Sequence, residues 1–334
     1  MNKKAIAMIS GGLDSLLSVK IMQKQGIDLI GLHFILTFTN SSIKKEKDGY
    51  VELKYNEKLG IDVINIFNDL EYFKVIQKPK FGYGQGINPC IDCKIYMFKR
   101  AKELMKEYNA SFIVSGEVVG QRPMSQLKRQ IEKIEKEAGL EGLILRPLSA
   151  LVLPETIPEK EGIIDRSKLF GISGRTRREQ MELAKQFGIT DYPTPGGGCM
   201  LTDKIFSKRV RDLFDNKKEY SLTDLHLLKL GRHFRFDETK IIVGRNKNEN
   251  IELENLAIES NYPVFIPSDI PGPSIVVDGM VNDNIMRFIS YLMFRYSDAK
   301  DRNEIIVRIR NLATVKDIII KRNNPDITIE NHII

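Results

Sequence analysis

The residues best suited to chemistry lie near the start of the chain, in segment 10–15, which reads Ser-Gly-Gly-Leu-Asp-Ser. An apolar run at residues 5–9 predicts a strand before it, and the spacing of the apolar residues after it predicts a helix. Glycines at such a junction let the backbone approach an anion closely, and the helix N-terminus directs free N–H groups toward it. We therefore predict a phosphate-binding loop, in which Ser10 and Ser15 add hydroxyl donors and Asp14 holds magnesium. An ordinary strand-to-helix turn is the simpler alternative.

The three cysteines of the chain, Cys90, Cys93 and Cys199, form a second candidate site. The Cys-x-x-Cys spacing of the first two is, in a cytosolic protein, more often metal-binding or catalytic than a structural disulfide. A helix is predicted to begin near Cys93, and Lys94 follows it, so we expect a lowered thiol pKa there. Cys199 follows a Pro- and Gly-rich segment, residues 193–198, that can bring backbone close to a ligand. Three small buried side chains with no chemical role are the simpler alternative.

Two chemistries fit three thiols, and the residues leave both open. In the first, Cys93 and Cys199 relay a persulfide and end as a transient disulfide, with Cys90 ancillary. In the second, all three cysteines bind a [4Fe–4S] cluster whose fourth iron stays open for a sulfide. A closed tetrahedral zinc site would need a fourth ligand, and the four histidines stand singly in the sequence. The cluster is the preferred interpretation.

Four segments carry a resemblance to known families. Residues 10–15 resemble the SGGxDS pyrophosphate loop of the ATP pyrophosphatase superfamily. Residues 88–94 resemble the Asn-Pro-Cys-x-x-Cys-Asn-Lys stretch of tRNA 2-thiouridylases, with the second asparagine absent. Residues 115–126 resemble the Gly-Glu-x-x-Gly-Gln-x-x-Ser-Gln motif of 4-thiouridine synthases, with one extra residue before Ser125. Residues 146–148, Arg-Pro-Leu, resemble the turn that follows the next strand in that family.

The resemblance implies an ATP-dependent tRNA sulfurtransferase, which adenylates a uridine carbonyl oxygen, releases pyrophosphate and replaces the oxygen with sulfur. It implies ATP and Mg²⁺ as cofactors beside the [4Fe–4S] cluster. The implied partners are tRNA and a sulfur donor, either a cysteine desulfurase or sulfide, and the oligomeric state stays open. The alternatives are a small-molecule amide- or nitrile-forming ATP pyrophosphatase and a non-enzymatic RNA-binding adaptor.

The expected site residues fall into three groups. The catalytic residues are Cys93, Cys199 and Asp14. The metal ligands are Cys90, Cys93 and Cys199. The nucleotide-binding residues are Ser10, Gly11, Gly12, Leu13, Asp14, Ser15, Gly116 and Gln121.

The composition is that of a globular protein, with 42% hydrophobic and 28% charged residues among 334. No stretch approaches the ~20 apolar residues of a membrane span, so we expect a cytoplasmic protein. The net charge of +7 suits a polyanionic partner without requiring one. Basic residues are frequent between residues 166 and 218, around Cys199, where they could hold RNA phosphates or form an ordinary solvated surface.

Strands and helices alternate over the first 150 residues, with one of the helices at residues 50–59. The alternation predicts an α/β fold with a Rossmann-like parallel sheet covered by helices on both faces, as in PP-loop (adenine nucleotide alpha-hydrolase-like) proteins. We expect this domain at residues 1–165 and a basic segment bearing Cys199, which completes the active site, at residues 166–215. A smaller α+β domain is expected at residues 216–334. Its Val-Gly-Arg-Asn segment resembles the RNA-binding domain of NFACT-type proteins, and an oligomerisation domain is the alternative.

Overall fold

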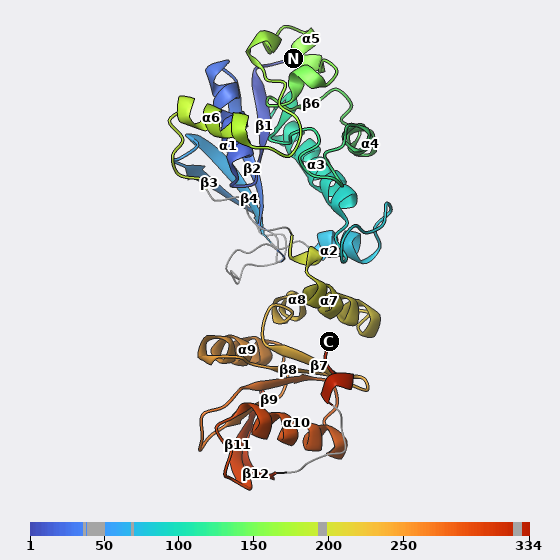
Figure 1. Cartoon of the computed structure of the whole chain (residues 1–334), viewed down its shortest axis with the longest axis vertical. Coiled ribbons are helices and arrows are strands. Elements are labelled where there is room, and N and C mark those ends of the chain that lie inside the picture. Colours follow the sequence, from blue (N-terminus) through green and yellow to red (C-terminus); the bar gives the residue numbers. More distant parts are fainter. Residues whose placement is uncertain (36–37, 39–50, 68–69, 193–198, 323–328) are drawn as a thin grey trace. The chain divides into compact units, whose positions relative to one another are not determined.

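The structure is a computed structural model that describes residues 1–35, 38, 51–67, 70–192, 199–322 and 329–334 (Figure 1). The chain divides into two compact units, Met1–Thr202 and Asp203–Ile334, called unit 1 and unit 2 below. Cys199 therefore belongs to unit 1, while the segment predicted to approach a ligand, residues 193–198, lies outside the described residues. The functional subdivision predicted at residues 165 and 215 stays a prediction.

Unit 1 is built on a six-stranded sheet whose strand order is β3-β4-β2-β1-β5-β6. Its strands are β1 Lys4–Ile9, β2 Asp28–Ile35, β3 Val51–Asn56, β4 Ile61–Phe67, β5 Phe112–Ser115 and β6 Ile144–Leu145. All neighbouring strands are parallel except β3 and β4. The predicted Rossmann-like sheet is confirmed, and strands β1, β2, β4 and β5 end at one edge, where such sheets bind their ligands.

Helices cover both faces of this sheet, as predicted (Figure 1). The helices of unit 1 are α1 Leu13–Lys24, α2 Leu70–Gln77, α3 Cys90–Glu107, α4 Lys128–Ala138, α5 Ile157–Lys160 and α6 Arg178–Gln186. Alternate residues of a strand point to opposite faces. Ala5, Ala7 and Leu29 accordingly pack in one apolar cluster with α1 and α6, while Phe34 contacts Tyr96 of α3 on the other face.

The helix predicted at residues 50–59 is wrong, because residues Val51–Asn56 form strand β3. Its apolar residues Val51, Leu53 and Tyr55 recur at every second position, which is the period of a strand. Strand β3 pairs with β4 in an antiparallel manner and lies at the edge of the sheet. Those three residues are 48%, 54% and 58% exposed. The strand therefore has no buried apolar run, and the two-residue period is its only sequence signal.

Unit 2 contains an all-antiparallel sheet with strand order β12-β11-β9-β10-β8-β7. Its strands are β7 Arg232–Phe236, β8 Thr239–Val243, β9 Val264–Pro267, β10 Ile275–Asp278, β11 Glu304–Arg310 and β12 Val315–Lys321. Its helices are α7 Lys204–Asn216, α8 Leu222–Leu227, α9 Lys247–Glu259 and α10 Asp283–Tyr296. Two apolar clusters, one containing α9 and the other containing α10, lie on the two faces of the sheet. The predicted α+β architecture is confirmed.

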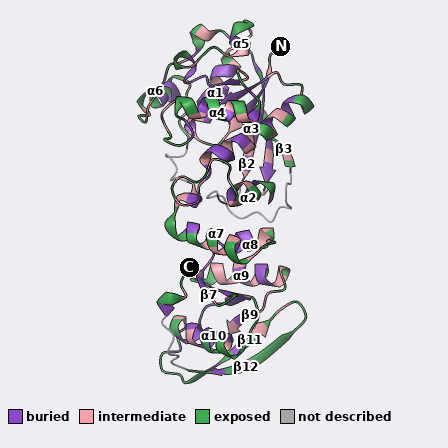
Figure 2. Ribbon diagram, turned by 90° about the vertical axis from the view of Figure 1, so that its right-hand side faces the viewer, coloured by how far each residue is buried: buried purple, intermediate pink, exposed green. Residues whose placement is uncertain are grey.

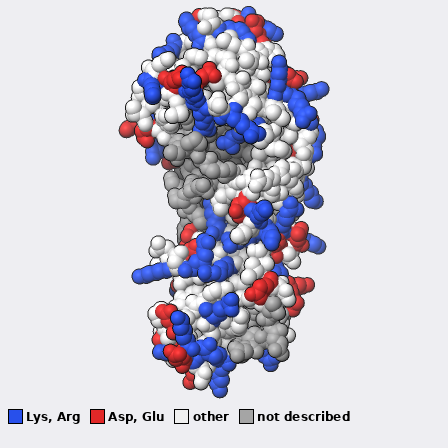
Figure 3. All heavy atoms as spheres, viewed as in Figure 1, with Lys and Arg blue, Asp and Glu red and all other residues white. Residues whose placement is uncertain are grey.

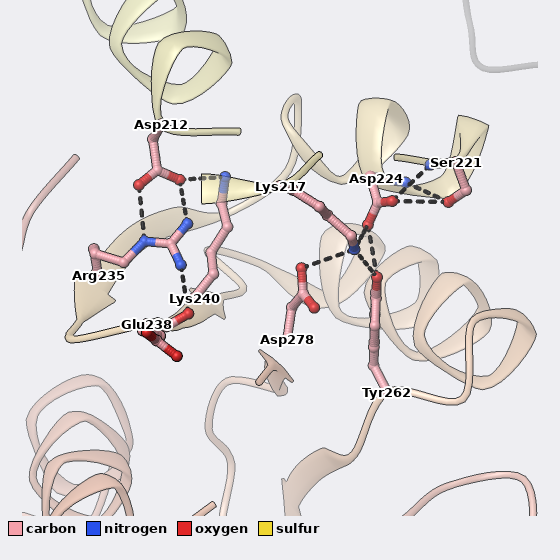
Figure 4. Close-up of polar contacts among 9 residues, drawn as sticks. All are labelled: Asp212, Lys217, Ser221, Asp224, Arg235, Glu238, Lys240, Tyr262 and Asp278. Atoms are coloured by element: carbon pink, nitrogen blue, oxygen red, sulfur yellow. Dashed lines mark hydrogen bonds and ion pairs between the residues drawn. The ribbon is translucent and has the colours of Figure 1, made fainter. Parts of the chain in front are cut away.

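Two networks of charged side chains bind α7 and α8 to the sheet of unit 2 (Figure 4). In the first, Asp212 of α7 accepts hydrogen bonds from Arg235 at 2.8 and 2.7 Å and lies 2.9 Å from Lys240 Nζ. Burial raises the pKa of Asp212, but the bonds from these two basic residues outweigh it and hold the pKa below its ordinary value.

In the second network, Lys217 Nζ donates to Asp224 Oδ1 of α8 at 2.8 Å, to Asp278 Oδ2 of β10 at 3.2 Å and to Tyr262 Oη at 2.5 Å. Ser221 and Asp224 form a capping box at the start of α8, which fixes that helix locally. Every one of these side chains thus finds its partners within unit 2.

Exposure is concentrated at one edge of the unit 2 sheet (Figure 2). The hairpin of β11 and β12 is largely exposed, and Val315 and Ile319 on it are each 62% exposed. Of the helices in the described parts of the chain, none is both long enough and apolar enough to cross a membrane.

Candidate nucleotide and thiol site

The predicted phosphate loop connects β1, which ends at Ile9, to α1, which begins at Leu13. Gly11 adopts a left-handed backbone with φ of +74°, which a side chain would disfavour. Ser15 Oγ donates to the Gly12 carbonyl at 2.8 Å, and Ser10 Oγ donates to Ser15 Oγ at 3.3 Å. The N-cap residue of α1, Gly12, has no side chain that could cap the helix, so this helix end keeps its capacity to bind an anion.

Two residues predicted to bind nucleotide have packing roles in the structure. The side chain of Leu13 is buried in the core, so only its backbone could contact a ligand. A Cβ atom at Gly116 would lie 2.7 Å from backbone atoms of Asp14 and Ser15, so glycine is required where the end of β5 meets α1. Nucleotide contact by either residue stays a prediction.

Asp14 and Gln121, which lie far apart in the sequence, contact each other. Gln121 Nε2 donates to Asp14 Oδ2 at 3.0 Å. The other oxygens of these side chains, Asp14 Oδ1 and Gln121 Oε1, are buried and have no hydrogen-bond partner in the part of the chain that the structure describes. Carboxylate and amide oxygens are ligands that Mg²⁺ prefers, so this pair fits the predicted metal. Arg177, which the sequence did not assign to this site, lies with Nη2 3.6 Å from Asp14 Oδ2.

The three thiols lie in one region of unit 1. Helix α3 begins at Cys90, earlier than predicted, so Cys90 and Cys93 both lie in its first turn. The Ile87 N–H donates to the Leu201 carbonyl at 3.0 Å, which holds the turn after Cys199 beside the Cys-x-x-Cys segment. Across the described residues, no three or more His, Cys, Asp or Glu side chains are gathered as a metal ion requires. Thiolate sulfur suits an iron–sulfur cluster by its chemistry, but the structure does not bring the three thiols, all of them on described residues, together as a metal site, so the ligand set stays a prediction.

The predicted lowering of the thiol pKa is wrong. Burial raises the pKa of Cys93 to about 11, and the charge of Lys94 offsets only part of this effect. Burial also raises the pKa of Cys90 and Cys199. The sequence showed the helix end and the lysine but not the low-dielectric surroundings of the sulfur atoms, and desolvation outweighs both.

Two residues that hold the thiol region were missed. The buried Tyr72 of α2 places its Oη 3.2 Å from Cys93 Sγ. Asp92, between the two cysteines, accepts the N–H groups of Lys80 and Phe81 at 2.8 and 3.1 Å and so anchors the preceding segment to α3. Of the two, only Asp92 has a signal in the sequence, because an acidic residue near the start of a predicted helix often has a structural role there.

A buried ion-pair chain links the thiol region to the motif at residues 115–126. Glu117 lies 3.2 Å from Lys94 Nζ and 3.1 Å from Arg146 Nε, and Arg146 also pairs with Glu135. Burial raises the pKa of Glu117, but Lys94 and Arg146 prevail and lower it. Arg122, which directly follows Gln121, lies near enough to Cys90 and Cys199 for its charge to lower their pKa against the effect of burial. One motif thus borders both the loop and the thiols.

A cavity of about 280 Å³ lies along strands β2, β3 and β4, and Ile9 at the end of β1, next to the loop, contributes to its lining. Burial lowers the pKa of His33 in its wall, and His33 Nδ1 lies 3.3 Å from Asn65 Oδ1. The lining residues are Ile9, His33, Ile35, Glu52, Lys54, Tyr55, Asn56, Val63, Asn65 and Phe67.

The sheet and the loop define a PP-loop protein of the ATP pyrophosphatase superfamily, joined to an antiparallel α+β unit. Residues 1–173, just over half of the chain, match the family described as Thiamine biosynthesis protein (ThiI), and the chain belongs to that family. Residues 231–332 match the NFACT protein RNA binding domain. The predicted resemblances, of the N-terminal part to tRNA-thiolating PP-loop proteins and of the C-terminal part to the NFACT RNA-binding domain, are confirmed.

Curated relatives agree with this assignment. A probable tRNA sulfurtransferase of Thermococcus kodakarensis is 30% identical over 171 residues, covering 50% of this chain and 41% of the relative. Another of Methanobrevibacter smithii is 28% identical over 169 residues, covering 50% and 43%. The tRNA-specific 2-thiouridylase MnmA of Petrotoga mobilis is 21% identical over 294 residues, covering 80% and 76%. The chain spans less than half the length of the first two relatives.

Proposed function

We propose that the protein is an ATP-dependent tRNA sulfurtransferase that replaces a carbonyl oxygen of a uridine with sulfur. The observation that carries the proposal is that residues of one motif border both sites: Gln121 bonds to Asp14 of the phosphate loop, and Glu117 pairs at 3.2 Å with Lys94, the residue after Cys93. An activating site and a sulfur site are thereby joined by one short motif. The names of the relatives, tRNA sulfurtransferase and tRNA 2-thiouridylase, support the same reaction.

The proposed first step activates the uridine. The nucleoside of ATP lies in the cavity that Ile9 helps to line, and its phosphates lie at the N-terminus of α1. The Ser10 and Ser15 hydroxyls, which now donate to Ser15 Oγ and the Gly12 carbonyl, would turn to donate to the phosphate oxygens. Asp14 Oδ1 and Gln121 Oε1 would hold Mg²⁺, which when bound neutralises charge on the leaving group. The uridine oxygen attacks the α-phosphorus, an O–P bond forms, the bond from the α-phosphorus to the bridging oxygen breaks, and pyrophosphate leaves.

The second step delivers sulfur. Hydrosulfide attacks the activated ring carbon, the C–O bond breaks, AMP leaves, and loss of the proton gives the thiocarbonyl. Cys90, Cys93 and Cys199 would hold a [4Fe–4S] cluster, which when bound supplies an open iron for sulfide. This route needs no oxidant and no reductant.

The relay remains the second candidate for the sulfur step. There the terminal sulfur of a Cys93 persulfide, which a cysteine desulfurase supplies, attacks the ring carbon, the C–O bond breaks and AMP leaves. The Cys199 thiolate then attacks Cys93 Sγ, the S–S bond breaks, and the thiouridine is released. A Cys93–Cys199 disulfide forms, which a thiol reductant must reduce before the next turnover.

Unit 2 is proposed to bind the tRNA. Its match to an RNA-binding domain supports this role. On the face shown in Figure 3, Lys and Arg side chains are spread over the surfaces of both units. Phosphate contacts of this kind position an RNA without reading its sequence.

The test is to compare nucleosides of tRNA from wild-type and deletion strains by mass spectrometry, and then to supply purified protein with that tRNA, ATP, Mg²⁺ and sulfide under anaerobic conditions. We expect a thiouridine to disappear from the deletion strain and to return in vitro with equal amounts of AMP and pyrophosphate. Release of AMP that does not depend on tRNA would favour a small-molecule substrate. An intact set of thiouridines in the deletion strain would contradict the proposal.

A further inference from the structure

Arg177 belongs to the basic stretch at residues 166–218, for which the sequence left RNA binding and a solvated surface open, yet its side chain lies beside Asp14 of the phosphate loop. Its Nη2 lies 3.6 Å from Asp14 Oδ2, and the two side chains are 28% and 16% exposed. The neighbouring Arg175 and Arg178 are exposed. We infer that Arg177 binds the phosphates of the nucleotide and that Asp14 positions it for this task. The inference rests on the proposed function, since it requires ATP as the ligand.

The backbone before Arg177 is fixed beside the motif at residues 115–126. Ser173 forms a parallel bridge with Val119, and the Gly174 N–H donates to the Val119 carbonyl at 2.7 Å. Arg177 then forms the N-cap position of α6. The segment is therefore held next to Gln121 and Asp14 by backbone contacts that do not involve the arginine itself, so its side chain is free to change partners.

The guanidinium of Arg177 is paired by charge but not by hydrogen bonds. At 3.6 Å it lies beyond hydrogen-bond distance, and Asp14 Oδ2 already accepts from Gln121. Arg177 donates no hydrogen bond within the described ranges of the chain, whereas Arg166 donates to Glu159 and to two carbonyl groups. A planar fork of N–H donors matches the oxygens of a phosphate, and here that fork keeps its donors available.

Binding of Mg²⁺ would favour an exchange in which Arg177 leaves Asp14 and pairs with a phosphate. Asp14 carries one negative charge, which Arg177 balances. A divalent cation bound by Asp14 would take over that balance and release the guanidinium to the phosphate oxygens that arrive with the metal. Arginine at that position would then oppose the charge that develops on the departing pyrophosphate.

The helix that follows keeps a polar group on its inner face. Gln180, one turn after Arg177, is fully buried, and both polar atoms of its amide lack a partner among the residues that the structure describes. Leu183 and Ala184 on the same face pack in the cluster that contains α1. The side of α6 that faces α1 thus carries hydrogen-bonding capacity beyond what packing needs.

The experiment measures binding of Mg²⁺–ATP and of Mg²⁺–pyrophosphate to the full chain by calorimetry, without tRNA. Arg177→Ala should weaken both by about 10- to 100-fold, the range for hydrogen bonds to a charged group. Arg177→Gln, which keeps the length but not the charge, should do the same. Arg175→Ala and Arg178→Ala, which remove exposed arginines from the same segment, are the matched controls and should bind as wild type does. Circular dichroism checks that each variant is folded.

Unchanged binding of both ligands by Arg177→Gln would overturn the inference. If the same variant then binds tRNA more weakly, Arg177 contacts RNA and not the nucleotide. If Arg177→Ala fails to fold, Arg177→Gln alone decides between these results. A wild-type protein that binds neither ATP nor pyrophosphate would instead refute the proposed function. The two failures are therefore distinguishable.

Discussion

The two units both bury charged side chains, but they use them differently. In unit 2, Asp212, Lys217 and Asp224 each pair with two or more partners of the same unit (Figure 4). In unit 1, Asp14 and Gln121 leave one buried oxygen each without a partner, within the part of the chain described. Buried polar atoms are normally satisfied, so these two oxygens, directly beside a phosphate loop, are consistent with a ligand site there. The charged networks around Asp212 and Lys217 stabilise unit 2 itself, whereas the Asp14–Gln121 pair of unit 1 leaves two oxygens available to a ligand.

The comparison is tested most strongly at Asp14. Asp14→Asn removes a metal ligand but keeps the shape of the side chain, so we expect pyrophosphate release to fall about a thousandfold, which corresponds to a few kcal/mol of lost transition-state stabilisation. Pyrophosphate release is measured with a coupled assay, and tRNA affinity by filter binding should stay close to wild type. Wild-type turnover would show that the loop has another purpose.

The cysteines give the next largest effect. If Cys90, Cys93 and Cys199 bind one cluster, each Cys→Ala variant should lose both iron and thiolation activity, because the loss of a ligand exposes the cluster. Iron content and product are measured on anaerobically purified protein. An active, iron-free Cys90→Ala protein would establish the relay instead, and a Cys93–Cys199 disulfide should then accumulate in a single turnover without reductant.

Removal of unit 2 should separate RNA binding from nucleotide binding. A chain ending at Thr202, the boundary between the units, should bind tRNA more weakly and with a flatter salt dependence, because each lost phosphate contact removes about 0.9 from the slope. Filter binding at several salt concentrations measures this slope, and calorimetry with ATP is the control. An unchanged slope in a folded protein would give unit 2 a different role.

The smallest expected effect is on stability. Asp212→Asn breaks a buried pairing with Arg235 and Lys240 and should destabilise unit 2 by about 2–3 kcal/mol at neutral pH. Because the pKa of Asp212 is lowered in the folded protein, its stabilising effect is present above the ordinary aspartate pKa and is lost as the pH falls through the lowered one. The gap between wild type and variant in urea unfolding should therefore close in acid. A gap that persists there would mean that packing, and not charge, is lost.

The parts of the site that could be predicted depend on short-range patterns. Residues 10–15 lie between an apolar run and a helical pattern, so the sequence predicts a strand, a turn and a helix in one stretch of chain. Gln121 was found because its motif resembles a known one, and the structure brings it to Asp14. Strand β3 was misjudged because its apolar residues face solvent, so periodicity was its only signal.

The parts that could not be predicted depend on long-range packing. Nothing in the sequence distinguishes Arg177 from Arg175 and Arg178, and only the folded backbone turns one of the three toward Asp14. The same holds for Tyr72, whose contact with Cys93 joins two helices. The raised pKa of Cys93 results from desolvation, a property of the surroundings that no local pattern contains.

The hydrogen bond from Ile87 to Leu201 has a consequence for how the protein is made. It ties the Cys-x-x-Cys segment to residues at the far end of unit 1. On the ribosome, Cys90 and Cys93 emerge and can fold against the sheet long before Cys199 is synthesised. A sulfur carrier or metal-loading partner that needs all three thiols can therefore act only after the whole of unit 1 has left the ribosome exit tunnel. Maturation of the site would follow the synthesis of unit 1 and could not begin at the Cys-x-x-Cys segment alone.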